Sequence, residues 1–275
     1  MAVKHAVAAA AQLACVFEVS AEKPGNITPR HDFADTSYED MLRSAIALGP
    51  ELARAGERGV GETVLAVVRA TRGVAGANTN LGIALLLAPL ARAALVGTGV
   101  AEVLRDLTRA DADAAYAAIR EARAGGLDAP VEHDVRDAPA VTLREAMAAA
   151  AERDSVAAEY ARDFSLTYGI GLPALGRALD AGLRVRDAVV ELFLALLAAV
   201  PDTLIARKRG REAAERVSVA AADAVAAGGV RSEPGRAAVV ELDAALRADG
   251  NALNPGTTAD LVTAVLFVAL LDGRL

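Results

Sequence analysis

The chain has 275 residues, of which 54% are hydrophobic, mostly Ala, Leu and Val, and only 3% are aromatic. Its net charge of −7 and the absence of a long basic run argue against a nucleic-acid-binding surface. Cys15 is the single cysteine, which excludes an internal disulfide and fits a reducing compartment, so we expect a cytoplasmic protein.

The N-terminal segment "MAVKHAVAAAAQLACVF" mimics a signal peptide, because Lys4 precedes a run of small apolar residues. Alanine dominates that run, and residues 16–32 have the composition of a site rather than of a mature terminus, so we interpret the segment as a buried first helix. Arg92 interrupts the apolar stretch 81–99, and the later apolar runs are too short to cross a bilayer. The sequence therefore predicts no membrane partner.

Helical periodicity and breaker residues predict about a dozen helices and no strand. Ala and Leu favour helix almost throughout the chain. The expected helices lie near residues 2–19, 38–56, 59–72, 79–97, 99–107, 111–124, 142–150, 152–167, 171–181, 184–199, 203–226, 233–247 and 257–272. No linker-like stretch divides the chain, so we predict a single all-α domain over residues 1–275.

Five polar segments that interrupt the helices are the candidate ligand-binding regions. They cover residues 18–37, 76–82, 131–139, 201–210 and 251–260. The chain has no Gly-Lys-Ser/Thr phosphate loop, no Gly-x-Gly-x-x-Gly after a strand, no Gly-x-Ser-x-Gly and no HExxH. A nucleotide that binds here must therefore be held by helix ends and loops.

The segment 18–37 combines a Pro-Gly turn with charged side chains. Lys23 is suited to phosphate, and Glu18 and Asp32 carry carboxylates, the ligands that magnesium prefers beside water and substrate oxygens. The alternative is an exposed charged loop, where most runs of charge belong.

Two helix starts share an Asn- and Thr-rich composition. Residues 76–82 read "GANTNLG" and residues 251–260 read "NALNPGTTAD", and each precedes a strongly apolar helix. Free N–H groups at a helix start, with Asn and Thr beside them, make an anion receiver. The alternative for the second segment is ordinary capping, in which Thr257 caps a helix beginning at Thr258 and Asp260 is the acid of a capping box.

The segment 201–210 places Asp202 at a helix start after Pro201 and ends in a basic run that includes Arg207. In the functional interpretation, Asp202 faces magnesium or a sugar hydroxyl while a cation faces phosphate. In the structural interpretation, the segment is a capped helix with a basic last turn.

Five pieces of sequence, "EVSAEKPGNIT", "HDF", "NTNLG", "PDTLIARKRG" and "LNPGTTADLVTAVLF", occur in an order similar to that of the triphosphoribosyl-dephospho-CoA synthase family. The resemblance runs from about Glu18 to Phe267. It implies an all-α, ATP-dependent transferase that uses ATP and magnesium. Enzymes of that family move the triphosphoribosyl group of ATP, through C1′, to the 2′-hydroxyl of 3′-dephospho-CoA, and adenine leaves.

That reaction asks for a carboxylate near C1′, a base for the acceptor hydroxyl and a donor for the departing adenine. Glu18 and Asp32 are the base candidates, and Asp202 is a third catalytic candidate. Magnesium is expected at Asp202 and Asp260. The residues expected to bind ATP and the acceptor are Lys23, Gly25, Asn26, Asn78, Thr79, Asn80, Arg207, Asn254, Gly256, Thr257 and Thr258.

The chain departs from the bacterial members of the family at two places. They read Asn-Thr-His-Lys-Gly where this chain has residues 78–82, and Asp-Thr-Asn where it has residues 202–204. These changes resemble an archaeal-looking branch. The alternatives are therefore a related ribosyl or phosphoribosyl transferase of another cofactor pathway, or a non-catalytic nucleotide-binding helical protein. The acceptor and a homo-oligomeric state are left open.

Overall fold

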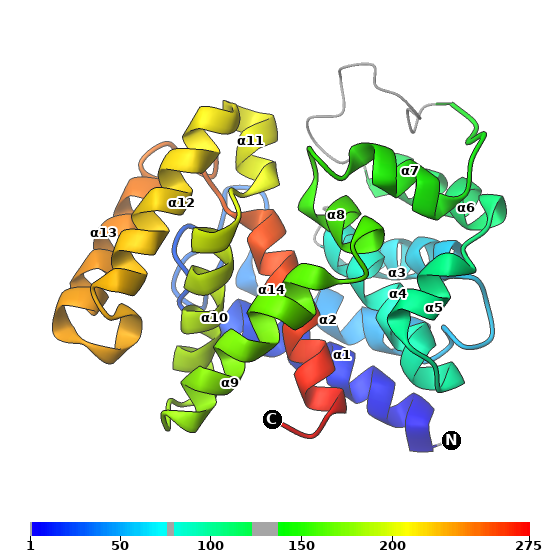
Figure 1. Ribbon diagram of the computed structural model, residues 1–275, viewed down its shortest axis with the longest axis horizontal. Helices are drawn as coiled ribbons and strands as arrows, with labels where there is room; N and C mark the ends of the chain where they lie inside the picture. The colour runs from blue at the N-terminus through cyan, green and yellow to red at the C-terminus, as the bar shows by residue number, and fades with distance from the viewer. Residues whose placement is uncertain (1, 76–79, 123–136) are drawn as a thin grey trace. The chain divides into compact units, whose positions relative to one another are not determined.

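The computed structural model describes residues 2–75, 80–122 and 137–275, and these residues form fourteen α-helices and no strand (Figure 1). The all-α prediction is confirmed. The helices are α1 (Ala2–Ser20), α2 (Tyr38–Leu52), α3 (Val60–Ala75), α4 (Leu81–Val96), α5 (Val100–Arg105), α6 (Arg109–Ala122), α7 (Leu143–Ala150), α8 (Ser155–Ala161), α9 (Leu172–Asp180), α10 (Val185–Ala199), α11 (Thr203–Arg209), α12 (Arg211–Ala226), α13 (Glu233–Arg247) and α14 (Gly256–Leu271).

Two of the expected helices are wrong in extent. The helix expected over 203–226 is two helices, because Gly210 between α11 and α12 has φ +88°, outside the helical region. The helix expected over 152–167 is limited to α8, because Asp163 and Phe164 adopt φ values of 51° and 62° shortly after it ends.

The chain divides into two units, which we describe separately. Unit 1 comprises Met1–Val16, Glu39–Phe164 and Phe267–Arg274, and unit 2 comprises Phe17–Tyr38, Ser165–Leu266 and Leu275. The expectation that residues 1–275 form one domain stays a prediction.

In unit 1, α3 packs against α4 and α6, and α4 also contacts α5 and α8. Pro89 lies inside α4 and has no N–H for the carbonyl of Leu85 four residues earlier. The buried hydroxyl of Tyr160 donates to that carbonyl at 2.7 Å, so a side chain of α8 replaces the missing helical bond. Burial raises the pKa of Tyr160, which keeps the phenol protonated as a donor.

In unit 2, α12 packs against α10, α11 and α13, and α9 packs against α10 (Figure 1). The apolar side of α10 supplies much of the core, with Leu192, Phe193 and Leu197 fully buried. Residues 21–37 form an irregular loop that belongs to the same unit, together with the first residues of α14. Unit 2 therefore contains three of the five polar segments.

One described helix, α1, is long and apolar enough to cross a membrane by length and composition alone, and 39% of its most apolar window is buried. The pair α10 and α11, bent by 57°, would be a second if the two were taken as one span. From the sequence we expect no uncharged apolar stretch that is long enough to cross a bilayer. Helix α1 is nevertheless apolar enough over its length, because its charged residues Lys4 and Glu18 lie near its two ends.

Candidate functional site

The buried ion pair of Glu18 and Lys23 lies where the last turn of α1 meets the following loop. Lys23 has an exposed fraction of 0%, and its Nζ is 3.0 Å from Oε1 of Glu18. The ammonium also donates to the main-chain carbonyls of Glu18 and Ala21. Burial raises the pKa of Glu18, and the charge and hydrogen bond of Lys23 oppose that rise. The predicted phosphate ligand Lys23 is thus enclosed by acceptors of its own chain.

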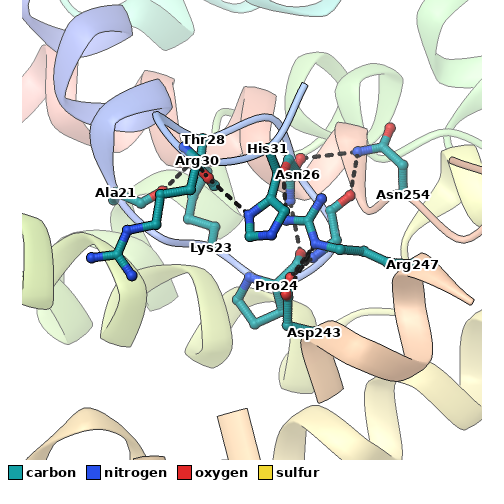
Figure 2. Close-up of polar contacts among 11 residues, drawn as sticks. Ala21, Lys23, Pro24, Asn26, Thr28, Arg30, His31, Asp243, Arg247 and Asn254 are labelled. Carbon is teal, nitrogen blue, oxygen red and sulfur yellow. Dashed lines mark hydrogen bonds and ion pairs between the residues drawn. The ribbon is translucent and has the colours of Figure 1, made fainter. Parts of the chain in front are cut away.

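Two side chains of α13, Asp243 and Arg247, bond to the backbone of the Gly25–Asn26 turn (Figure 2). Gly25 N–H donates to Oδ1 of Asp243 at 2.8 Å, and Nη2 of Arg247 donates to the carbonyl of Asn26 at 2.7 Å. Gly25 has φ +70°, and a Cβ at this position would lie 2.8 Å from Cβ of Leu246. Only glycine therefore fits here without displacing α13 or straining the turn.

The side-chain amides of Asn26 and Asn254 are both buried and bond to one another. Nδ2 of Asn254 donates to Oδ1 of Asn26 at 3.0 Å and to the carbonyl of Gly25 at 3.3 Å. Nδ2 of Asn26 donates to the carbonyl of Pro24 at 3.1 Å. The polar groups that the sequence offered as ligand contacts instead join the loop to the segment before α14.

Asp202 is buried, with an exposed fraction of 2%, and its carboxylate caps two helices. Oδ1 accepts from the N–H groups of Leu204 and Ile205 at 2.8 and 3.1 Å, which caps α11. Oδ2 accepts from the N–H and the hydroxyl of Thr258 at 2.7 and 2.8 Å, which caps α14. The negative charge at the start of α14 is therefore the chain's own carboxylate.

The expected cap of α14 is wrong. The helix begins at Gly256, so Thr257 lies inside its first turn and accepts a hydrogen bond from the hydroxyl of Thr203 at 3.2 Å. Thr258, expected to open the helix, is instead the residue bonded to Asp202. Asp260 is half-buried in the same helix.

Asp202 as found does not fit the magnesium role predicted for it, because both carboxylate oxygens already accept two hydrogen bonds each. Its pKa is raised by burial, and the bonds from Thr258, Ile205 and Leu204 oppose that rise. Within residues 2–75, 80–122 and 137–275, no group of three His, Cys, Asp or Glu side chains is arranged to hold a metal ion. The role of Asp260 stays a prediction.

The turn from Thr28 to Asp32 in unit 2 begins at the buried Thr28 and exposes the four residues that follow it. Thr28 and His31 exchange two backbone hydrogen bonds at 3.0 and 3.1 Å, and the N–H of Arg30 donates to the hydroxyl of Thr28. The side chains of Arg30, His31 and Asp32 are exposed. Oδ1 of Asp32 accepts from the N–H of Tyr38 at 2.7 Å, which holds the carboxylate in place.

The last turn of α11 presents three exposed cations, Arg207, Lys208 and Arg209. Nζ of Lys208 donates to the carbonyl of Asn251 at 3.2 Å. Desolvation lowers the pKa of Lys208, and the negative charges of Asp202 and Asp35 oppose that change. The negative charge of Asp35 in the loop therefore acts on Lys208 at the end of α11.

Asn80 in unit 1 is the N-cap of α4, but its side chain makes no capping hydrogen bond. Its exposed fraction is 2%, and its Nδ2 has no hydrogen-bond partner among the residues that the structure describes. Two neighbouring predicted ligands, Asn78 and Thr79, lie outside the described residues. Asn80 is thus a buried donor that the described chain does not use.

Sequence reasoning missed Asp243 and Arg247, which hold the loop against α13. Their i,i+4 spacing places both on one helix face, but such pairs are usually ordinary surface ion pairs. Nothing in the local sequence indicates that this face meets a loop more than two hundred residues earlier, as the separations of 218 and 221 residues show.

The chain matches, over residues 4–275, the family model described as ATP:dephospho-CoA triphosphoribosyl transferase. It is 30% identical to an Archaeoglobus fulgidus protein whose crystal structure is assigned to a triphosphoribosyl-dephospho-CoA synthase. That comparison has a TM-score of 0.65 and covers 84% of this chain and 99% of the other.

Curated relatives match a shorter stretch. A Klebsiella pneumoniae 2-(5''-triphosphoribosyl)-3'-dephosphocoenzyme-A synthase is 31% identical over 104 residues, which are 38% of this chain and 36% of the relative. A Pseudomonas paraeruginosa protein named as a probable synthase of the same kind is 34% identical over 105 residues, 38% of this chain and 35% of the relative. The match thus spans about a third of the curated relatives' length.

Proposed function

Because this chain belongs to the ATP:dephospho-CoA triphosphoribosyl transferase family, we propose that it transfers the 5-triphosphoribosyl group of ATP to the 2′-hydroxyl of 3′-dephospho-CoA. The hydroxyl oxygen bonds to C1′ of the ATP ribose, and the bond from C1′ to N9 of adenine breaks. The hydroxyl proton goes to a base of the enzyme, and adenine leaves after taking up a proton. The observation that carries this proposal is the family match over residues 4–275.

Asp32 is the acceptor base in this proposal. Its side chain is exposed, and one of its carboxylate oxygens is held by the N–H of Tyr38 at 2.7 Å, so it combines solvent access with a fixed orientation. Glu18 has a raised pKa, which suits a base, but it is buried and paired with Lys23. We therefore assign Glu18 to the framework of the loop.

Within unit 2, the phosphate ligands in this proposal are the exposed cations at the end of α11, Arg207 and Lys208. Within unit 1, Asn80 has a buried side-chain amide whose Nδ2 lacks a partner among the described residues, and we propose it as a separate contact for substrate. Magnesium enters with ATP as part of the substrate, coordinated by the triphosphate. The predicted phosphate contacts of the other residues stay predictions: Lys23, Gly25, Asn26, Asn78, Thr79, Asn254, Gly256, Thr257 and Thr258.

The cytoplasmic location, the absence of nucleic-acid and membrane partners, and the oligomeric state remain predictions or open questions. A cytoplasmic location is supported by the chemistry proposed here, because the donor is ATP and the acceptor is a precursor of CoA.

The test incubates the purified chain with magnesium, ATP and 3′-dephospho-CoA and follows free adenine by chromatography. We expect adenine and an acceptor whose mass has grown by one triphosphoribosyl group. The matched control is the acceptor with hydrogen in place of its 2′-hydroxyl, which should yield neither. Adenine release with a different acceptor would favour another cofactor pathway, and ATP binding without any adenine release would favour the non-catalytic alternative.

A further inference from the structure

The side chains of Asp243 and Arg247 in α13 bond to backbone groups of the loop, and not to side chains of the loop (Figure 2). Nε of Arg247 donates to both carboxylate oxygens of Asp243 at 2.8 and 2.9 Å. Asp243 accepts the N–H of Gly25, and Arg247 donates to the carbonyl of Asn26. One ion pair therefore holds both sides of the Gly25–Asn26 turn, and its charged groups orient one another.

The base of the loop, residues 23–27, is fixed from three directions. Lys23 is bonded to Glu18 at the end of α1, Asn26 is bonded to Asn254 before α14, and the turn between them is held by Asp243 and Arg247. The side chains of Asp243 and Arg247 are 28% and 20% exposed, so water competes only partly for these bonds. These contacts join the base of the loop to α1, to α13 and to the segment before α14.

Residues 23–27 are followed by the turn from Thr28 to Asp32, in which Thr28 is buried and residues 29–32 are exposed. This turn carries Asp32, the carboxylate proposed to accept the hydroxyl proton. The base of the loop itself offers few free polar groups, because Lys23 and Asn26 are bonded within the unit. A rigid base followed by an exposed turn is the arrangement expected where a catalytic group must keep a fixed position.

We infer that Asp243 and Arg247 are positioning residues for the proposed reaction: by clamping the Gly25–Asn26 turn, they set the position of the Thr28–Asp32 turn that meets the acceptor. This inference rests on the proposed function for its activity measurements. Neither residue contacts substrate in this account, and both act through the loop.

The first test compares Arg247→Met with Arg216→Met. Arg216 makes the same kind of i,i+4 pair with Glu212 on α12, at 2.7 Å, but the two side chains are 66% and 88% exposed. We expect amide hydrogen exchange in residues 24–32 to quicken in Arg247→Met and to stay unchanged in Arg216→Met. Equal exchange of these amides in wild type and Arg247→Met would overturn the clamp, whether or not the chain releases adenine.

The second test separates positioning from general stability by a kinetic cycle with Asp32→Asn. Because misplacing a reacting group by about 1 Å can cost about 100-fold in rate, we expect Arg247→Met to lower kcat/KM for adenine release by about 10- to 100-fold. If the clamp acts through Asp32, most of this loss should vanish in the Asp32→Asn background. Fully additive losses in the double variant would overturn the inference.

The third test uses conservative replacements. Arg247→Lys retains the charge but cannot reproduce the Arg fork, which bonds Asp243 and the Asn26 carbonyl together, so we expect kcat/KM between those of wild type and Arg247→Met. Asp243→Asn keeps the shape and an acceptor for Gly25 but loses the ion pair, and it should show the same coupling to Asp32. Wild-type kinetics in both Arg247→Met and Asp243→Asn would contradict the role. A wild-type chain that releases no adenine would defeat the proposed function alone, since hydrogen exchange still decides the clamp.

Discussion

The starts of α14 and α4 have a similar composition of Asn and Thr but opposite hydrogen-bond states. At α14, the N–H and hydroxyl of Thr258 are bonded to Asp202, and the amide of Asn254 is bonded to the loop. At α4, the amide of Asn80 is buried, yet it has no partner among the described residues. At the start of α14, a carboxylate of the same chain accepts the hydrogen bonds, whereas at the start of α4 the amide donor has no partner among the described residues.

This difference shows what an Asn- and Thr-rich helix start does and does not predict. It predicts that acceptors are needed, because buried N–H groups and amides must be bonded. It does not predict whether groups of the protein or of a ligand supply those acceptors. At α14 the supplier is a residue 56 positions away in the sequence, whereas at α4 we propose the substrate. The bonded side chains of Asn254 and Thr258 therefore have a structural role, and a contact of Asn80 with substrate is a proposal.

The largest effect expected on the framework side is that of Lys23→Met. It leaves the buried carboxylate of Glu18 without its counter-charge, which should lower the free energy of unfolding by about 3–5 kcal/mol. Urea denaturation followed by circular dichroism measures this change. The double variant Glu18→Leu/Lys23→Met should recover most of the loss. A single variant as stable as wild type would show that the pair is not buried as described.

The next effect is that of Asp202→Asn. Asparagine can still cap α11, but its NH₂ group would face the donors of Thr258, so we expect a loss of about 2 kcal/mol from the α14 contact. Asp154, whose Oδ1 caps α8, provides the control. Its Asn variant should change stability by less than about 1 kcal/mol, because Asn caps helices about as well as Asp. Equal losses in the two variants would remove the special role of Asp202.

A smaller effect concerns pH. Because burial raises the pKa of Glu18, the folded state keeps a proton that the unfolded state has lost between the ordinary glutamate pKa and the raised value. The free energy of unfolding should therefore fall as pH rises through this window, and the fall should be weaker in Glu18→Gln. Denaturation curves of both proteins across the acidic range provide the comparison. Identical slopes would mean that Glu18 does not titrate differently on folding.

The fold could be predicted because its signals are local: Ala- and Leu-rich composition, helical periodicity and breakers. The break at Gly210 was missed because glycine is often tolerated within a helix, and only its φ of +88° makes it a boundary. Composition indicates that the polar segments containing Glu18, Asp202 and Asn254 are candidate binding regions, and that role stays a prediction. Their bonding could not be predicted, because each partner choice depends on contacts between distant segments.

We propose that the polar groups at the start of α14 stabilise the fold, whereas the side-chain amide at the start of α4 contacts substrate. This claim is tested most directly by measuring, on the same preparations of Asn80→Ala and Asp202→Asn, the free energy of unfolding and kcat/KM for adenine release. We predict that Asn80→Ala keeps its stability within about 1 kcal/mol, because it removes a donor without a partner in the described chain, and loses at least tenfold, on the order of 1.4 kcal/mol, in kcat/KM. Loss of stability in Asn80→Ala with unchanged kcat/KM, beside a fully stable Asp202→Asn, would contradict the claim.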